Sequence, residues 1–127
     1  MTSVTASQLT FGTTYTFVVQ SGNSFGLSAY SAELPLICAT TPAKPLAPTT
    51  ENLNSNVVVR WQAPSARGLP ILSYSVYFRK SDLTFDMTSA CNGGDATIMT
   101  ELKCTVPLLT LRSPTTFNLA QENIVVV

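Results

Sequence analysis

Apolar and polar residues alternate through much of the chain, and the first clear run lies at residues 13–20. A period of two is typical of a half-buried strand, because successive side chains of a strand point to opposite faces. A turn-forming group follows at residues 23–26, and a second strand is predicted from about residue 28 towards residue 39. The two strands would form a hairpin. The face predicted to be buried carries Tyr15, Phe17 and Val19.

The second half of the chain repeats this pattern. Longer strands are predicted at residues 56–61 and 72–79, and shorter ones at residues 83–87, 97–99, 104–109 and 124–127. The two longer strands have apolar faces that carry Val57, Val59 and Trp61 in the first and Leu72, Tyr74, Val76 and Phe78 in the second. No segment with a helical period extends beyond about one turn. The predicted fold class is therefore all-β.

Three prolines separate the two halves. Pro42, Pro45 and Pro48 stand at three-residue spacing. Because proline fixes φ and lacks an N–H, such a run favours an extended, stiff connector. We therefore predict a Pro-rich junction at residues 42–48, which separates the strands of one domain at residues 1–41 from a second domain at residues 49–127.

The low charge content argues against two classes of binding partner. The chain has 7 Lys+Arg, 7 Asp+Glu and no His, and its charged fraction is 11%, against about 25% in an average soluble domain. Without clustered Lys and Arg we expect no nucleic-acid partner and no binding to an anionic membrane. Membrane insertion is not expected either, because the longest terminal aliphatic run, residues 124–127, is too short to span. Hydroxyls replace charge: 13 Ser and 18 Thr together are 31 of 127 residues, or 24%.

The same composition argues against catalysis. His, the side chain best suited to proton transfer near neutral pH, is absent. The Ser and Thr hydroxyls lie in neither an S-x-x-K nor a G-x-S-x-G context. Asp82, Asp86 and Asp95 are conceivable calcium ligands, but their spacing fits no EF-hand loop and solvated turn carboxylates are the favoured interpretation. We expect no enzyme activity, no metal site and no cofactor.

Two of the three cysteines flank a turn-forming run. Cys91 and Cys104 lie on either side of residues 92–95. A disulfide bond between them would close a loop of about 14 residues and contribute roughly 3 kcal/mol. The alternative is two reduced, buried thiols in a cytosolic protein. We favour the disulfide. Cys38 would be a free buried thiol or would pair with a cysteine outside this chain.

Together these residues resemble the fibronectin type III family. The last two strands of that family contain a Leu, a Gly-Thr-x-Tyr group, alternating apolar positions, Asn-x-x-Gly and a Ser. Its first half contains Pro-x-x-Pro, a Trp, a Pro/Gly loop with Pro-Ile, and a Tyr. The principal matching positions here are Leu9, Gly12, Tyr15, Asn23, Gly26, Trp61, Pro70 and Tyr74. The resemblance implies an immunoglobulin-like β-sandwich, present as parts of two consecutive domains, the second without its last strand.

The resemblance also implies a repeat. Setting Ile124 on Tyr15 gives an offset of 124 − 15 = 109 residues, with an insertion around residues 88–103. Because Ile124 replaces the family Tyr, the corner hydrogen bond of that Tyr is not expected in the second domain. A sandwich that lacks a strand exposes an unpaired edge. Either the chain is a window on a longer polypeptide, which we favour, or neighbouring chains complete each other by strand addition.

Few side chains are predicted to bind a ligand. Trp61, Tyr74, Tyr15 and Phe17 lie on apolar strand faces, so core packing is favoured over a sugar-binding platform. Tyr30 and Tyr77 are expected nearer to solvent. Residues 22–26 lack the Arg-Gly-Asp group with which adhesive members of the family bind integrins. The Thr/Pro stretch is either an undecorated linker or a site of O-glycans, for which the candidate positions are Thr40, Thr41, Thr49 and Thr50.

We expect a non-enzymatic structural module of a tandem array, extracellular or at the cell surface, that spaces, stiffens or assembles into a fibre or coat. Its expected partners are copies of itself or neighbouring repeats, and carbohydrate. Two alternatives belong to other classes, namely a ligand-binding or adhesion ectodomain and an accessory domain of a secreted carbohydrate-active enzyme.

Overall fold

The computed structural model describes residues 9–119 and is rich in strands, with few helices. The chain divides into two compact units. Unit 1 contains Met1–Ala43 and Ser65–Pro70, and unit 2 contains Lys44–Pro64 and Ile71–Val127. The residues predicted as a junction are thus shared between the units, and the division falls after Ala43.

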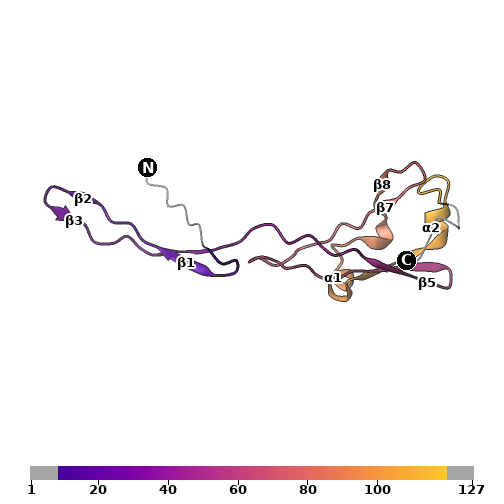
Figure 1. Cartoon of the computed structure of the whole chain (residues 1–127), viewed down its shortest axis with the longest axis horizontal. Helices are drawn as coiled ribbons and strands as arrows, with labels where there is room; N and C mark the ends of the chain where they lie inside the picture. The colour runs from indigo at the N-terminus through magenta and orange to yellow at the C-terminus, as the bar shows by residue number, and fades with distance from the viewer. Residues whose placement is uncertain (1–8, 120–127) are drawn as a thin grey trace. The chain divides into compact units, whose positions relative to one another are not determined.

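Unit 1 is built around one long hairpin (Figure 1). Strand β1 (Thr14–Phe17) pairs antiparallel with β4 (Leu34–Ile37), and β2 (Gly22–Asn23) pairs with β3 (Gly26–Leu27) near the tip. The regular strands are shorter than the alternating pattern predicts. The reason is a change of register, since four residues lie between Phe17 and Gly22 on one arm whereas six lie between Leu27 and Leu34 on the other.

Two serines bridge this irregular stretch. Ser28 Oγ accepts a hydrogen bond from Ser21 N at 3.1 Å and donates to Ala29 O at 2.8 Å. Ser31 Oγ accepts from Val19 N at 3.0 Å and donates to Ala32 O at 2.9 Å. Each hydroxyl therefore stands in for a main-chain acceptor where the strands are out of register, which keeps the facing amides bonded.

The β1–β4 ladder has two different faces. The register pairs Tyr15 with Leu36 and Phe17 with Leu34, and paired residues of an antiparallel ladder share a face. We call these four residues the hairpin face. Contrary to the expected core packing, Phe17 is 42% exposed and Tyr15 is only half-buried. No described residue of unit 1 is buried, because no second layer covers this face among residues 9–43 and 65–70.

The two outer edges of this ladder also differ. Cys38 N donates to Thr13 O at 2.9 Å, and hydrogen-bonded pairs alternate along an antiparallel ladder. The Tyr15–Leu36 pair is therefore hydrogen-bonded and the Thr16–Pro35 pair is not, so that the Pro35 nitrogen lies on the outer side of β4. A proline there cannot donate to an added strand. The outer side of β1 has no such block.

Unit 2 contains a three-stranded antiparallel sheet, in the order β5 (Thr49–Leu53), β6 (Asn56–Arg60) and β9 (Lys103–Pro107). A tight turn with Asn54 at φ 55° joins the first two strands. A second, two-stranded ladder pairs β7 (Phe78–Arg79) with β8 (Phe85–Asp86). Although only Phe78–Arg79 is regular strand, Tyr74, Val76 and Phe78 are half-buried and alternate with exposed residues, as predicted; Leu72 is 82% exposed.

Three short helical segments correct the expectation of strands alone. They are η1 (Ser89–Cys91), α1 (Ala96–Glu101) and α2 (Leu108–Arg112). The strand predicted at residues 97–99 is therefore wrong, because Asp95 ends a turn and starts a helix there. The strand predicted at residues 104–109 ends at Pro107, which is the N-cap of α2. The strand predicted at residues 124–127, including Ile124, lies outside the described residues.

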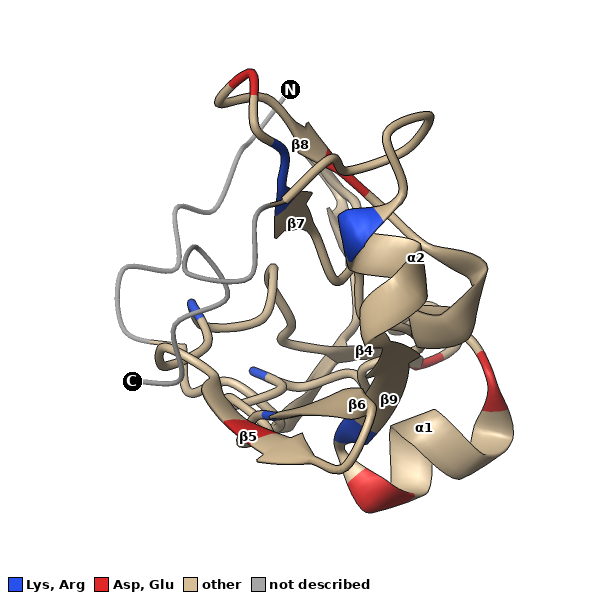
Figure 2. Cartoon of the chain, turned by 90° about the vertical axis from the view of Figure 1, so that its right-hand side faces the viewer, with Lys and Arg blue, Asp and Glu red and all other residues tan. Residues whose placement is uncertain are grey.

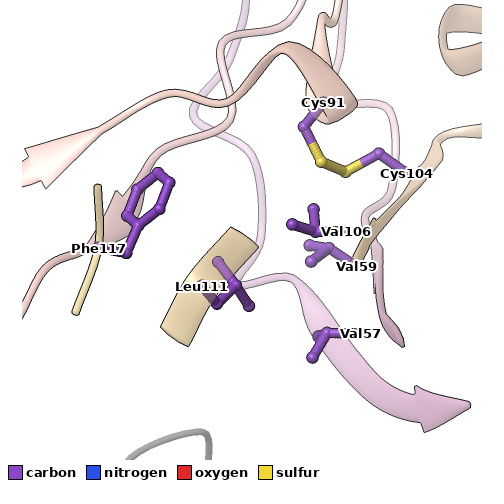
Figure 3. Close-up of a cluster of buried hydrophobic side chains, with 7 residues drawn as sticks. All are labelled: Val57, Val59, Cys91, Cys104, Val106, Leu111 and Phe117. Atoms are coloured by element: carbon purple, nitrogen blue, oxygen red, sulfur yellow. A yellow bond between two sulfur atoms is a disulfide. The ribbon is translucent and has the colours of Figure 1, made fainter. Parts of the chain in front are cut away.

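The core of unit 2 lies between the three-stranded sheet and the segments that follow β8 (Figure 3). Val57 and Val59 contribute from β6, as the alternation predicts, and Trp61 packs against them at the edge of the cluster. Phe117 meets Phe78 edge-to-face with ring centroids 5.9 Å apart. The buried cluster consists of Val57, Val59, Cys91, Cys104, Val106, Leu111 and Phe117.

Candidate functional site

The disulfide bond Cys91–Cys104 crosslinks two segments of unit 2. It joins η1 to β9, with the two Cα atoms 5.3 Å apart, and both cysteines are at most 3% exposed (Figure 3). Thr88 Oγ1 accepts from Ala90 N and starts the turn that carries Cys91. The bond fixes the base of the segment that contains α1, and this segment falls where the insertion was expected.

Gly93, inside this segment, leaves no room for a side chain. The Gly93 carbonyl accepts a hydrogen bond from Tyr74 N at 3.0 Å, and a Cβ on Gly93 would overlap Tyr74 O. Asn92 holds the turn, because its side chain donates to Asp95 Oδ1 at 2.8 Å and accepts from Gly94 N at 3.3 Å. The turn-forming composition of residues 92–95 was recognisable from the sequence, but the contact of Gly93 with Tyr74, 19 residues earlier, was not.

An apolar groove lies beside the only tryptophan of the chain. Trp61 and Tyr74, both half-buried, lie with ring centroids 5.4 Å apart and an interplanar angle of 58°. The Trp61 Nε1 atom is buried and has no hydrogen-bond partner within the described part of the chain. The groove has a volume of about 160 Å³. We call it the Trp61 groove, and its main lining residues are Pro45, Leu46, Pro48, Trp61, Val76 and Tyr77.

The base of the hairpin in unit 1 is built by close backbone contacts. Cys38 is half-buried and makes no disulfide within residues 9–119, and its carbonyl accepts from Gly12 N at 2.8 Å. Gly68 has φ +107°, and a Cβ there would come within 2.5 Å of the same carbonyl. Arg67 O accepts from Thr40 N at 3.1 Å. The segment Ser65–Pro70, which contains the exposed Pro70, is thereby bound to the end of the hairpin.

The other motif residues of unit 1 form turns rather than a binding site. Tyr15 Oη accepts a hydrogen bond from Thr10 N at 2.9 Å, and Asn23 Oδ1 accepts from Phe25 N at 2.9 Å. Gly12 and Gly26 have φ of +84° and +140°, which non-glycine residues rarely adopt. Leu9 is 38% exposed. These contacts shape the hairpin and leave its apolar face uncovered by the described residues.

Residues expected to meet solvent do so. Tyr30 and Tyr77 are 69% and 56% exposed. Of the candidate O-glycan positions, Thr40, Thr41 and Thr49 are exposed, whereas Thr50 is half-buried within β5.

Charged residues are sparse and of mixed sign (Figure 2). In the β7–β8 turn, hydrogen bonds from the Thr84 hydroxyl at 2.6 Å and the Thr84 amide at 3.0 Å lower the pKa of Asp82. Within residues 9–119, no cluster of three His, Cys, Asp or Glu side chains suitable for a metal ion is found. No described helix has the length and hydropathy needed to cross a membrane.

No protein-family model matches this chain, and no curated protein matches it in sequence. The structure brings Trp61 and Tyr74 together in unit 2, and Gly12, Tyr15, Asn23 and Gly26 into the hairpin of unit 1. Cys38 belongs to unit 1 and the Cys91–Cys104 bond to unit 2. Two residues whose roles the sequence did not predict are Thr10 and Ser31.

Proposed function

We propose that this chain is a non-enzymatic structural module of a tandem fibronectin type III array that is extracellular and assembles into, or decorates, a fibre or surface coat. The hydrogen bond between Thr10 N and Tyr15 Oη carries this proposal. A tyrosine that bonds back to the backbone a few residues upstream, at the start of a late strand, is a hallmark of immunoglobulin-like sandwiches. Tyr15 has this hydrogen bond at the start of β1, ahead of a long hairpin.

The disulfide bond supports an extracellular location. Disulfides form and persist in oxidising compartments, and they are rare in the cytosol. Cys91 and Cys104 are at most 3% exposed and lie within the core cluster, so their bond is a structural element of unit 2.

The surface supports a role in assembly. Of residues 9–43 only Glu33 is charged, and the chain as a whole has no net charge. Like-charge repulsion normally keeps soluble proteins apart, and near-zero net charge promotes association. Exposed apolar residues in unit 1 include Phe17, Leu34 and Leu36, and a surface of this kind suits contact with neighbouring modules.

Localisation and native size test the proposal. An antibody against residues 9–119 should label the surface of intact cells, or fibres outside them, in electron micrographs. A denaturing gel of the native material, developed with the same antibody, should show a ladder or very large species for a tandem array. Label confined to the cell interior would contradict the extracellular role, and a single band near the 13.6 kDa of this chain would contradict the array.

A further inference from the structure

The segment closed by the Cys91–Cys104 bond contains the only Asn-Gly pair of the sequence, Asn92–Gly93. In such a pair the main-chain nitrogen of the glycine can attack the side-chain carbonyl carbon of the asparagine, because glycine has no Cβ to hinder the approach. A bond forms from this nitrogen to Cγ, ammonia leaves, and a succinimide ring remains. Water then opens the ring at either carbonyl group and leaves aspartate or isoaspartate. Asn92 is exposed, so it has both the neighbour and the access to water that this deamidation requires.

The observed conformation of Asn92 opposes the reaction. Ring closure requires the Cβ atom of Asn92 and the nitrogen of Gly93 to lie on the same side of the Cα–C bond. An L residue reaches this arrangement at strongly negative ψ, whereas Asn92 has ψ 95°, which places the two atoms on nearly opposite sides. The side chain is also held, because Nδ2 donates to Asp95 Oδ1 at 2.8 Å and Oδ1 accepts from Gly94 N at 3.3 Å. Cyclisation therefore needs the turn to open.

Two contacts on either side of this bond keep the turn closed. The Gly93 carbonyl accepts a hydrogen bond from Tyr74 N at 3.0 Å, and the backbone of Tyr74 occupies the place of a Gly93 side chain. Cys91, the residue before Asn92, is bound covalently to Cys104 and is 2% exposed. A large rotation at Asn92 must therefore move Gly93 away from Tyr74 while Cys91 stays in place. Loss of the disulfide bond removes the second of these restraints.

We propose that Asn92 is a deamidation site that the disulfide bond keeps inactive, and that reduction of Cys91–Cys104 makes it reactive. A dithiol reductant supplies the two electrons and two protons that convert the bond into two thiols, and the reductant becomes a disulfide itself. The turn then opens more often, and Gly93 N reaches Asn92 Cγ. One water is consumed and one ammonia is released for each residue converted. The site does not depend on the proposed assembly function.

Both products prevent the turn from closing as before. Aspartate at position 92 has no amide to donate to Asp95 Oδ1, and it brings a second carboxylate to a contact that is now 2.8 Å long. Like charges at this distance repel. Isoaspartate adds a methylene group to the main chain beside Gly93, where the backbone of Tyr74 leaves no space. Deamidation thus makes the effect of reduction permanent, because the modified segment no longer returns Cys91 to Cys104.

Peptide mapping of the full chain by mass spectrometry measures the rate of deamidation at Asn92. Oxidised protein is compared with protein kept in a dithiol reductant at the same pH and temperature. The reduced protein should react about a hundredfold faster, the equivalent of the roughly 3 kcal/mol that the bond contributes. Cys91→Ala/Cys104→Ala should react at this faster rate without reductant. Asn23, an exposed turn residue of unit 1, is the internal control, and its rate should not change on reduction.

A variant that retains the disulfide bond tests the turn by itself. Asp95→Ala removes the acceptor of Asn92 Nδ2. It should speed deamidation of the oxidised protein roughly fivefold, the equivalent of the about 1 kcal/mol of one hydrogen bond. Asp86→Ala is the matched control, because it also removes an exposed carboxylate that accepts from a main-chain amide, that of Met87, and it should leave the rate unchanged.

Re-oxidation tests the permanence of the change. Freshly reduced protein should re-form the Cys91–Cys104 bond in air, whereas the deamidated fraction of protein aged in reductant should not. Equal rates at Asn92 in the oxidised and the reduced protein would overturn the proposal, and so would an Asn92 that stays intact in both the reduced protein and Cys91→Ala/Cys104→Ala. A deamidated fraction that re-forms the bond as readily as fresh protein would contradict the permanent effect.

Discussion

Unit 1 and unit 2 share an alternating, hydroxyl-rich sequence, but they are held together by different interactions. Unit 2 buries a cluster of side chains around a disulfide bond. Unit 1 has no buried residue within its described part, and its hairpin is held by main-chain pairing, serine hydroxyls and a tyrosine hydroxyl.

Hydrogen bonds and apolar burial contribute different amounts to the stability of the two units. A hydrogen bond contributes only about 0.5–1.5 kcal/mol net, because it replaces one with water. Burial of one large apolar side chain contributes about 1.5–3 kcal/mol. The polar contacts of unit 1 can therefore fix the register of a hairpin, but independent stability needs a covered apolar face. Unit 1 should gain stability from whatever covers that face, whereas unit 2 should depend on its own core.

Removing the disulfide bond should have the largest effect on the stability of unit 2. In Cys91→Ala/Cys104→Ala we expect a loss of about 3 kcal/mol in the free energy of unfolding, because the unfolded chain regains the entropy of a loop of about 14 residues. Urea unfolding followed by Trp61 fluorescence measures this loss, and Cys38→Ser is the control. An unchanged urea midpoint would show that the core holds without its covalent link.

Gly93→Ala should weaken unit 2 by about 2 kcal/mol, because the added Cβ overlaps Tyr74 O and overpacking costs about 1–3 kcal/mol. Gly94→Ala, one residue later, is the matched control, because its Cβ would be no closer than 3.5 Å to the nearest atom. The same urea experiment compares the two variants. Equal midpoints would mean that the approach of Gly93 to Tyr74 does not constrain the fold.

Tyr15→Phe tests the polar scaffold of unit 1. Loss of the hydroxyl that accepts from Thr10 N should destabilise this corner by about 1 kcal/mol. The measurement is hydrogen exchange at the Thr10 amide, which should be roughly fivefold faster, while the urea midpoint of unit 2 stays unchanged. Tyr30→Phe, at a 69% exposed tyrosine, should leave the Thr10 amide unaffected. Equal exchange in both variants would contradict a structural role for this hydrogen bond.

The smallest effect is expected at the β7–β8 turn. Hydrogen bonds from Thr84 hold the pKa of Asp82 below its ordinary value of 3.8. Because the pKa of Asp82 is lower in the folded than in the unfolded protein, its hydrogen bonds stabilise the turn fully at a pH above the ordinary pKa. This stabilisation is lost as the pH falls through the pKa of the folded protein. In an NMR titration, Thr84→Val should raise the pKa of Asp82 towards 3.8, and Thr100→Val should not. A pKa that is the same in all three proteins would contradict the assigned cause.

The sequence predicted which face of each strand is apolar better than it predicted whether that face is buried. Alternation correctly identified Val57 and Val59 as core residues, because the sheet that carries them is covered within unit 2. The same alternation at Tyr15 and Phe17 predicted burial that the structure does not show. Periodicity tells which face of a strand is apolar, but it does not tell what covers that face.

The local sequence pattern predicted the wrong secondary structure where a turn determines how the following segment folds. Thr97, Ile98 and Met99 were predicted as a short strand from the alternating pattern of the chain, yet they lie in α1. The turn held by Asn92 and Asp95 and the disulfide at its base determine how the segment starts and where it returns. The groove at Trp61 was also missed, since it forms from segments far apart along the chain.

The disulfide bond also changes how the chain would respond to a pulling force. In a fibre, tension is transmitted from one end of the polypeptide to the other, and a protein that unfolds lengthens by about 3.4 Å for every residue released. Cys91 and Cys104 are 13 residues apart in sequence, so their bond withholds about 40 Å of extension from unit 2. Force applied along the chain bypasses α1 and passes directly from η1 to β9. Reduction of the disulfide bond would make that extension available, so the redox state of the surroundings would set how far the module can extend.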